Sequence, residues 1–171
     1  MTQKCLANFF VAASLSAVVS LPSWADDKDN AAQLSKALAE ATVSLEQGLR
    51  ASEREGKPIS GKFEIEGGTL QLSIYTMKGD RFAEVIVDYK SGSIMKVENI
   101  TDADDLKAAR AQSQAMAKAN VPLAKAVRDA ISAHGAYRAV SVTPIVKAGG
   151  TMADITLMKG EDVKKVSEKL N

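Results

Sequence analysis

The chain has 171 residues, with 22 Lys and Arg against 21 Asp and Glu, so its formal net charge is +1. Basic and acidic residues are interspersed along the chain, whereas binding to nucleic acid requires a concentrated cationic face. One histidine and one cysteine cannot build a typical zinc site or, once the leader is removed, a Cys–His pair. The sequence therefore predicts no nucleic-acid partner, no metal site and no cofactor.

The first 25 residues have the pattern of a secretory signal peptide. Lys4 is followed by an apolar run from Cys5 to Ser20, and small residues at Ser23 and Ala25 precede two aspartates. The alternative is a membrane anchor, but the run is shorter than the ~20 residues that span a bilayer and it ends at Pro22. We expect cleavage after Ala25 and a periplasmic or secreted bacterial protein without cysteine, disulfide or membrane span.

Two helices are predicted at the start of the exported chain. Residues 30–41 carry apolar side chains at helical spacing. After a break, Ser44 and Gln47 have the spacing of a capping box and predict a second helix that ends near Gly56. Its expected inward residues are Leu45, Gly48, Leu49 and Ser52.

From residue 63 to residue 100 the apolar period changes to 2, which is typical of strands. Apolar and polar residues alternate in FEIE, LQLSIY, RFAEVIVDY and SIMKVENI, and a glycine stands in each linker between them. Short linkers of this kind indicate hairpins. The sequence therefore predicts a four-stranded antiparallel meander after the two helices.

The remaining chain begins with the same order of elements. Residues 101–118 form a predicted helix with acidic residues in its first turn, and Pro122 separates it from a helix that stops at Gly135. Two strands are expected next, at residues 137–147 and 151–158, with Gly149-Gly150 between them. Beyond Gly160, Val163, Val166 and Leu170 stand at helical spacing and predict a C-terminal helix.

Short segments also repeat in sequence. VSLEQGLRAS at residues 43–52 matches VPLAKAVRDA at residues 121–130, and GGTLQLSIYTMKGD at 67–80 matches GGTMADITLMKGED at 149–162. We infer an α+β chain of two related units, residues 26–100 and an incomplete copy at 101–171. Because the second copy is incomplete, the two are expected to pack as one body.

The first unit resembles the PepSY domain family. The capped helix VSLEQGL and the strand–turn–strand AEVIVDYKSGSIMKV are similar to that family's V-S-x-E-Q-A helix and E-V-x-V-D strand, with Gly48 where the family has Ala. The second unit lacks the E-V-x-V-D strand. The resemblance implies a tandem of cystatin-like folds, each with helices over an antiparallel sheet, and it implies only loosely a role in restraining a secreted or envelope peptidase.

Residue types that carry chemistry have plainer interpretations here. His134 is expected to end a helix. The acids from Asp102 to Asp105 fail the spacing of a calcium loop and indicate a charged first helical turn. Three glutamates are expected on the solvated side of a sheet, the paired glycines at hairpin corners, and the dispersed methionines in the core. These are Glu64, Glu66, Glu84, Gly67, Gly68, Gly149, Gly150, Met77, Met95, Met116, Met152 and Met158.

Two classes of function follow from this absence of a catalytic set. The first is a non-catalytic, exported protein-binding module that acts through a sheet edge or a hairpin tip on another envelope or secreted protein. The expected contact tips are Lys78, Gly79 and Asp80, and Lys147, Ala148, Gly149 and Gly150. The alternative is a small-molecule carrier or sensor with a pocket between helix and sheet, for which polar residues such as Gln71 or Ser73 would face the helix. No catalytic residue is predicted.

Overall fold

The computed structural model describes the backbone of residues 24–171 and the side chains from Asn30 onward. The described chain forms four helices and seven strands. These are α1 (Trp24–Leu38), α2 (Leu45–Ser52), β1 (Lys57–Glu66), β2 (Thr69–Lys78), β3 (Arg81–Val87), β4 (Ile94–Asn99), α3 (Ala103–Ala117), α4 (Leu123–Ala133), β5 (Arg138–Lys147), β6 (Gly150–Lys159) and β7 (Asp162–Lys169). The expected signal peptide lies mostly in residues 1–23, outside the described residues, and its expected cleavage point after Ala25 falls in the first turn of α1.

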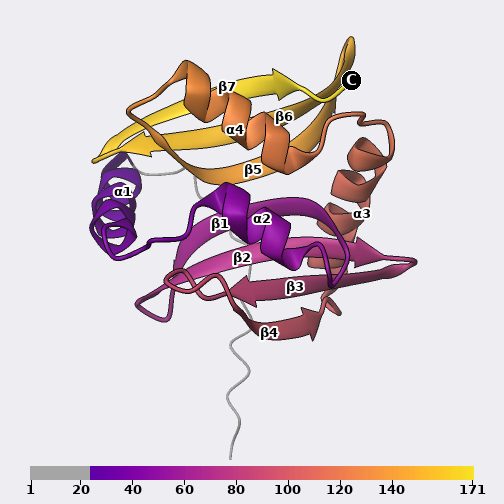
Figure 1. Cartoon of the computed structure of the whole chain (residues 1–171), viewed down its shortest axis with the longest axis horizontal. Helices are drawn as coiled ribbons and strands as arrows, with labels where there is room; N and C mark the ends of the chain where they lie inside the picture. Colours follow the sequence, from indigo (N-terminus) through magenta and orange to yellow (C-terminus); the bar gives the residue numbers. More distant parts are fainter. Residues whose placement is uncertain (1–23) are drawn as a thin grey trace, which may run out of the picture.

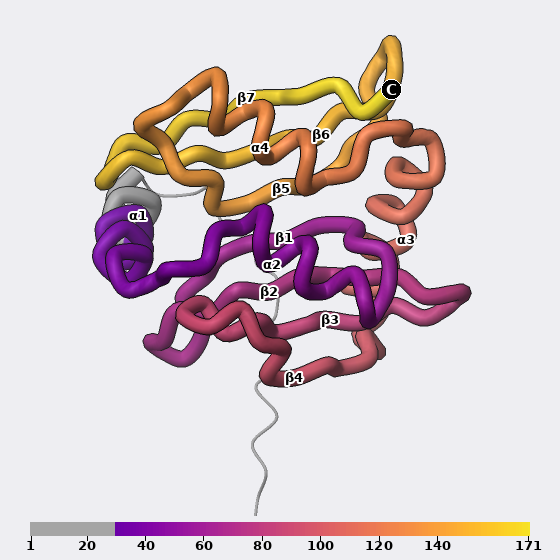
Figure 2. The backbone as a smooth tube through the Cα atoms, in the orientation of Figure 1, coloured from indigo at the N-terminus to yellow at the C-terminus, as the bar shows by residue number. Residues whose placement is uncertain are grey.

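All seven strands belong to one sheet, in the order β4-β3-β2-β1-β5-β6-β7. Every neighbouring pair is antiparallel. Figures 1 and 2 show the strands following one another in this order, with α2 and α4 in front of the sheet and α1 and α3 at its two ends. The α+β class and the four-stranded meander β1–β4 predicted from the sequence are confirmed.

The two faces of the sheet differ in polarity. Gly61 and Ile74 are paired across β1 and β2, and a Cβ placed on Gly61 would meet Ile74 and two leucines of α2. The neighbouring pair, Ser60 and Tyr75, must therefore face the other way, and the Ser60 hydroxyl donates to Gln112 on α3 at 2.8 Å. The face under α2 and α4 is apolar, and the face that α3 covers in part is polar.

Helix starts follow from local sequence. Ser44 accepts a hydrogen bond from the Gln47 amide, and the Gln47 side chain accepts one from the Ser44 amide, so the capping box is confirmed. The four predicted inward residues of α2 are all buried. Asp102 accepts from the amides of Asp104 and Asp105, which confirms a charged first turn for α3.

The two halves of the chain share details of hydrogen bonding. Before α2, two consecutive amides donate to the carbonyl of Tyr89, and before α4 two consecutive amides donate to the carbonyl of Leu170. The donors are Thr42 and Val43 in the first half and Asn120 and Val121 in the second. Ladder irregularities also correspond, between Pro58 and Ser60 in β1 and between Ala139 and Ser141 in β5.

The halves meet where β1 pairs with β5. Only two residue pairs form this ladder, Gly61 with Val142 and Lys62 with Ser141. Pro144, which has no amide hydrogen, lies just beyond the part of β5 that pairs with β1. Because the sheet continues through this junction and α2 packs on α4, the expectation that the halves form one body is met.

The predicted C-terminal helix over residues 161–171 is wrong, because this segment forms β7. Lys159-Gly160 makes a hairpin turn, with φ of Gly160 at 59°, as Lys78-Gly79 does with φ of Gly79 at 62°. Val163 is paired with Met158 and Val166 with Ile155, on opposite faces of the sheet. The three-residue spacing that suggested a helix therefore comes from an edge strand with one apolar residue on each face. With β7 included, the second half has two helices and three strands, and it lacks a fourth strand in the place of β4.

Candidate binding edge

The two predicted contact tips lie at the same end of the strands, which is on the right in Figure 1. Lys78-Gly79-Asp80 is the β2–β3 turn and residues 147–150 form the β5–β6 turn. Both tips are at the end of the sheet where β1 begins, since Lys57 pairs with Met77 and β5 runs antiparallel to β1. Three strand intervals separate the tips in the order of the sheet. Residues 78–80 and 147–149 are exposed, and Gly150 is half-buried against Asn171.

An apolar groove of about 340 Å³ opens between these tips. On one side Gly56 lies against the Met77 backbone, next to the β2–β3 turn. On the other side Asn120 donates to the carbonyl of Leu170, whose own amide donates to Thr151 beside the β5–β6 turn. We call this surface, made of the two tips and the groove, the binding edge.

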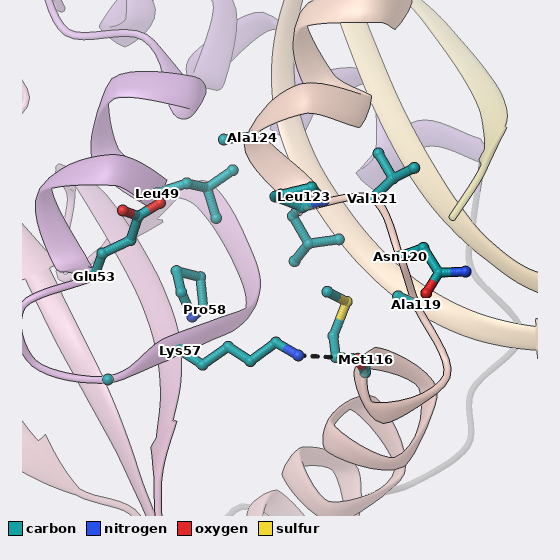
Figure 3. A pocket seen from close by; sticks show the side chains of 12 residues that line it. Leu49, Glu53, Lys57, Pro58, Met116, Ala119, Asn120, Val121, Leu123 and Ala124 are labelled. Atoms are coloured by element: carbon teal, nitrogen blue, oxygen red, sulfur yellow. Dashed lines mark hydrogen bonds between the residues drawn. The ribbon is translucent and has the colours of Figure 1, made fainter. Parts of the chain in front are cut away.

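The groove is built from the end of α2, the start of β1 and the segment that joins α3 to α4. Figure 3 shows the side chains of Leu49, Pro58, Met116 and Leu123 gathered around it. Leu49, Met116 and Leu123 also belong to the hydrophobic core, so the groove floor is part of the packed interior. Its volume is at the lower end of the range typical of small-ligand sites.

Polar groups stand at the rim of the groove. The ammonium of Lys57 donates to the Met116 carbonyl at 3.0 Å near the end of α3 and holds the joining segment against β1 (Figure 3). Glu53 and Asn120 are exposed on either side. An apolar floor with a charged and amide-bearing rim suits an apolar side chain presented by another protein.

A second concavity, of about 360 Å³, lies between α3 and the polar face of the sheet. Lys62 and Tyr75 line it, with Asp105 and Gln112 from α3. The Lys62 ammonium is 2.5 Å from a Glu64 oxygen and 5.8 Å from the centre of the Tyr75 ring. Burial works to lower the pKa of Lys62, but the hydrogen bond to Glu64 and the attraction of Tyr75 and Glu64 raise it.

The Tyr75 phenol keeps its proton to unusually high pH. Burial raises the pKa of Tyr75 to about 12, against the nearby Lys62 charge, which works to lower it. An unfolded tyrosine has a pKa of about 10. Because the folded pKa is the higher one, this contribution to stability is complete below pH ~10 and is lost as the pH rises toward ~12.

We predict that Tyr75→Phe weakens the alkaline loss of stability. The measurement is the free energy of unfolding by urea from neutral pH to pH ~12, with tyrosinate absorbance followed in parallel. In the variant, the phenol that ionises last should disappear from the absorbance curve. Tyr89→Phe is the matched control, because its ring also lies near a lysine, with Lys90 Nζ 5.6 Å from the ring centre. An unchanged alkaline profile in Tyr75→Phe contradicts the assignment.

The other sequence candidates are dispersed in the structure. His134 is the C-terminal cap of α4, with its ring 6.4 Å from that of Tyr137. Glu64 is tied to Lys62 and accepts from the Ser73 hydroxyl, while Glu66 is exposed at the end of β1. The paired glycines are at hairpin corners as predicted: Gly67 and Gly68 lie between β1 and β2, Gly149 lies between β5 and β6, and Gly150 begins β6.

The methionines divide between core and surface. Met116 and Met158 are buried, Met77 packs partly against the core, and Met95 is 68% exposed. The prediction of core filling is therefore wrong for Met95, because β4 is an edge strand with no helix over it. Gln71 and Ser73 lie on the face of the sheet opposite α2 and α4. They alternate along β2 with Leu72 and Ile74, whose side chains lie against Gly48 of α2.

Within residues 24–171, no three His, Cys, Asp or Glu side chains come together in a way that would hold a metal ion. In the same part of the chain, none of the helices combines the length and the apolar character needed to cross a membrane.

The sequence indicated the tips of the binding edge but not its groove. Leu49 was predicted only as an inward residue of the second helix. The available indications were two chain breaks: Gly56 and Pro58 follow the second helix of the first unit, and Asn120-Val121-Pro122 precedes the second helix of the second unit.

Comparison with known proteins adds no relative. No family model matches the chain, and neither a curated protein nor a solved structure matches it significantly.

Proposed function

We propose that the chain is an exported, non-catalytic protein-binding module of PepSY type that binds another envelope or secreted protein through the binding edge. The observation that carries the proposal is the apolar groove between two exposed hairpin tips at one end of the strands. Turn residues that project from a rigid sheet can enter a cleft of a partner, while the groove accepts an apolar side chain in return.

The organisation into two PepSY-like repeats is part of the same proposal. It is supported by the repeated order of helix, helix and three antiparallel strands, and by the corresponding hydrogen bonds before α2 and α4. It is also supported by the pairing of Gly61 with Val142, which lie at corresponding places in β1 and β5 relative to the two ladder irregularities. The family resemblance implies a peptidase as the partner class to test first.

Site-specific photo-crosslinking in the producing cell tests this function. A photoreactive residue at Lys78 or Lys147 is expected to capture a partner protein from the envelope or the medium. Lys159 is the matched control, because Lys159-Gly160-Glu161 is a turn of nearly the same sequence as Lys78-Gly79-Asp80 at the opposite end of the sheet. Capture from Lys159 equal to that from Lys78, or no capture from either tip, contradicts the proposal.

Two further measurements separate the parts of the proposal. The mass of the protein recovered outside the cytoplasm should correspond to a chain that begins at Asp26. Micromolar concentrations of that protein should slow a metallopeptidase secreted by the same cell if the partner is a peptidase. Capture by the tips without any slowing of peptidases would keep the binding function and remove the peptidase.

The second candidate is a small-molecule carrier or sensor. It is favoured by the concavity between α3 and the sheet, where Ser60, Lys62, Tyr75 and Thr143 are polar lining residues. Ligand binding raises apparent stability, so a thermal-shift screen with polar small molecules should find compounds whose effect is lost in Lys62→Met. Thermal shifts that persist in this variant would place the ligand elsewhere.

A further inference from the structure

The two edge strands of the sheet differ in how they are protected against pairing. An exposed edge strand presents unpaired amides and carbonyls, and natural proteins guard such edges with charged residues, especially lysine. β7 carries Lys164, Lys165 and Lys169. β4 carries one lysine, and its apolar residues Met95 and Val97 are 68% and 44% exposed.

The outward hydrogen-bonding groups of β4 follow from its pairing with β3. The Ile100 amide donates to the Phe82 carbonyl at 3.0 Å, so Ile100 directs its backbone groups toward β3. Alternation along an antiparallel strand then directs the groups of Glu98 and Lys96 toward β3 and those of Val97 and Asn99 away from it. In any added strand, the residues opposite Val97 and Asn99 must therefore form the hydrogen-bonded pairs.

Charge selects one register for a second copy of the same strand. If Val97 lies opposite Asn99 of the other copy, Glu98 faces Glu98, and if Val97 lies opposite Met95, Lys96 faces Lys96. Like charges directly opposite each other destabilise a strand pair. With Val97 opposite Val97, each Lys96 faces the Glu98 of the other copy. Both copies then make identical contacts, as a two-fold axis requires.

We propose that two copies of this chain pair antiparallel through β4, with the two Val97 residues opposite each other, to form one sheet across the dimer. The intrachain pair Lys96–Glu98, at 2.8 Å, already holds the two side chains side by side on one face of the strand. In the dimer these four charges alternate in sign, and the two Val97 side chains cover each other on the other face. This interface lies at the β4 edge and is separate from the binding edge.

Sedimentation equilibrium of the purified chain, from low micromolar to millimolar concentration, tests the dimer. We expect a monomer–dimer equilibrium for the unmodified chain. Lys96→Glu and Glu98→Lys should each raise the dimer dissociation constant at least about tenfold, because each turns two attractive cross-strand pairs into repulsive ones. An equimolar mixture of the two variants should form a heterodimer, since every Glu then faces a Lys.

The controls separate loss of pairing from loss of the fold. Both positions are exposed, so the thermal midpoint of each variant should stay close to that of the unmodified chain. Lys165→Glu on β7 should leave the dimer unchanged. A monomer at all concentrations, a dimer that survives Lys96→Glu, a dimer lost in Lys165→Glu, or a mixture that fails to associate would each overturn the proposal.

Discussion

Arg138→Leu is expected to lower the free energy of unfolding by about 3 kcal/mol. The Arg138 guanidinium donates to the carbonyls of Leu38 and Ala41, both at 3.0 Å, and to that of Val43 at 2.6 Å. It also lies 5.0 Å from the centre of the Phe63 ring. Leucine removes the guanidinium donor from three carbonyls at the end of α1 and in the joining segment, although the Leu38 carbonyl keeps the Ala41 amide as a donor. It also removes the cation over the aromatic ring.

Urea unfolding measures this loss, and two other variants define its cause. Arg54→Leu is the surface control, because the Arg54 side chain is 66% exposed and should change stability by less than ~1 kcal/mol. Arg138→Lys keeps the charge but places a single ammonium where a planar fork reached three carbonyls, so an intermediate loss is expected. If Arg138→Leu costs no more than Arg54→Leu, the guanidinium does not hold the joining segment.

Arg138 and Lys57 occupy corresponding places in the two halves. Each stands at the start of the first strand of its half, and each donates to a carbonyl near the end of the first helix of the other half. Arg138 therefore holds the end of α1 against the second half, and Lys57 holds the end of α3 against the first half. No sequence pattern predicted these contacts, because they depend on helices and strands that lie far apart along the chain.

The motif behind the family resemblance has a local physical explanation. A carboxylate oxygen of Asp88 accepts from the amides of Lys90 at 3.0 Å and Ser91 at 2.5 Å, and these hydrogen bonds lower its pKa. Gly92 follows with φ of 77°, a conformation that glycine adopts without strain. The alternating runs on either side of this glycine-containing linker predicted the hairpin correctly, and such turn residues constrain the fold far more than they constrain the partner.

The sequence predicted an element best where the element is buried on one face. In β2 the alternation of apolar and polar residues predicted the buried face, and in α2 the Ser–Gln capping box predicted where the helix begins. β7 was missed because it is an exposed edge strand, where no single apolar face exists. The repeated turn Met-Lys-Gly was the better indicator, since a turn that begins a strand in one half begins one in the other.

Gly61→Val is expected to lower the free energy of unfolding by about 3 kcal/mol. Gly61 pairs with Val142 at the junction of the halves. A Cβ at this position would lie 2.7 Å from Cδ1 of Ile74, 3.3 Å from Cδ1 of Leu45 and 3.4 Å from Cδ2 of Leu49. Valine adds three carbons beneath α2, in a core that is already filled, so the terminal methyl groups of Ile74, Leu45 and Leu49 must move aside or α2 must shift.

Gly135→Val is the matched control, because a Cβ at Gly135 would meet no atom within 4 Å. Its cost should stay below ~1 kcal/mol. Ile74→Val removes the nearest clashing atom, so Gly61→Val combined with Ile74→Val should be less destabilised than the sum of the two single changes. A sum that is strictly additive would show that Gly61 and Ile74 are not in contact.

The same variants report whether the halves unfold together. Gly61 lies under α2 and beside β5, so a change there perturbs the first half and the junction at once. Calorimetry should show one transition that moves to lower temperature as a whole, with its calorimetric enthalpy equal to its van't Hoff enthalpy. Two separated transitions in Gly61→Val would mean that residues 26–100 and 101–171 are independent folding units despite their shared sheet.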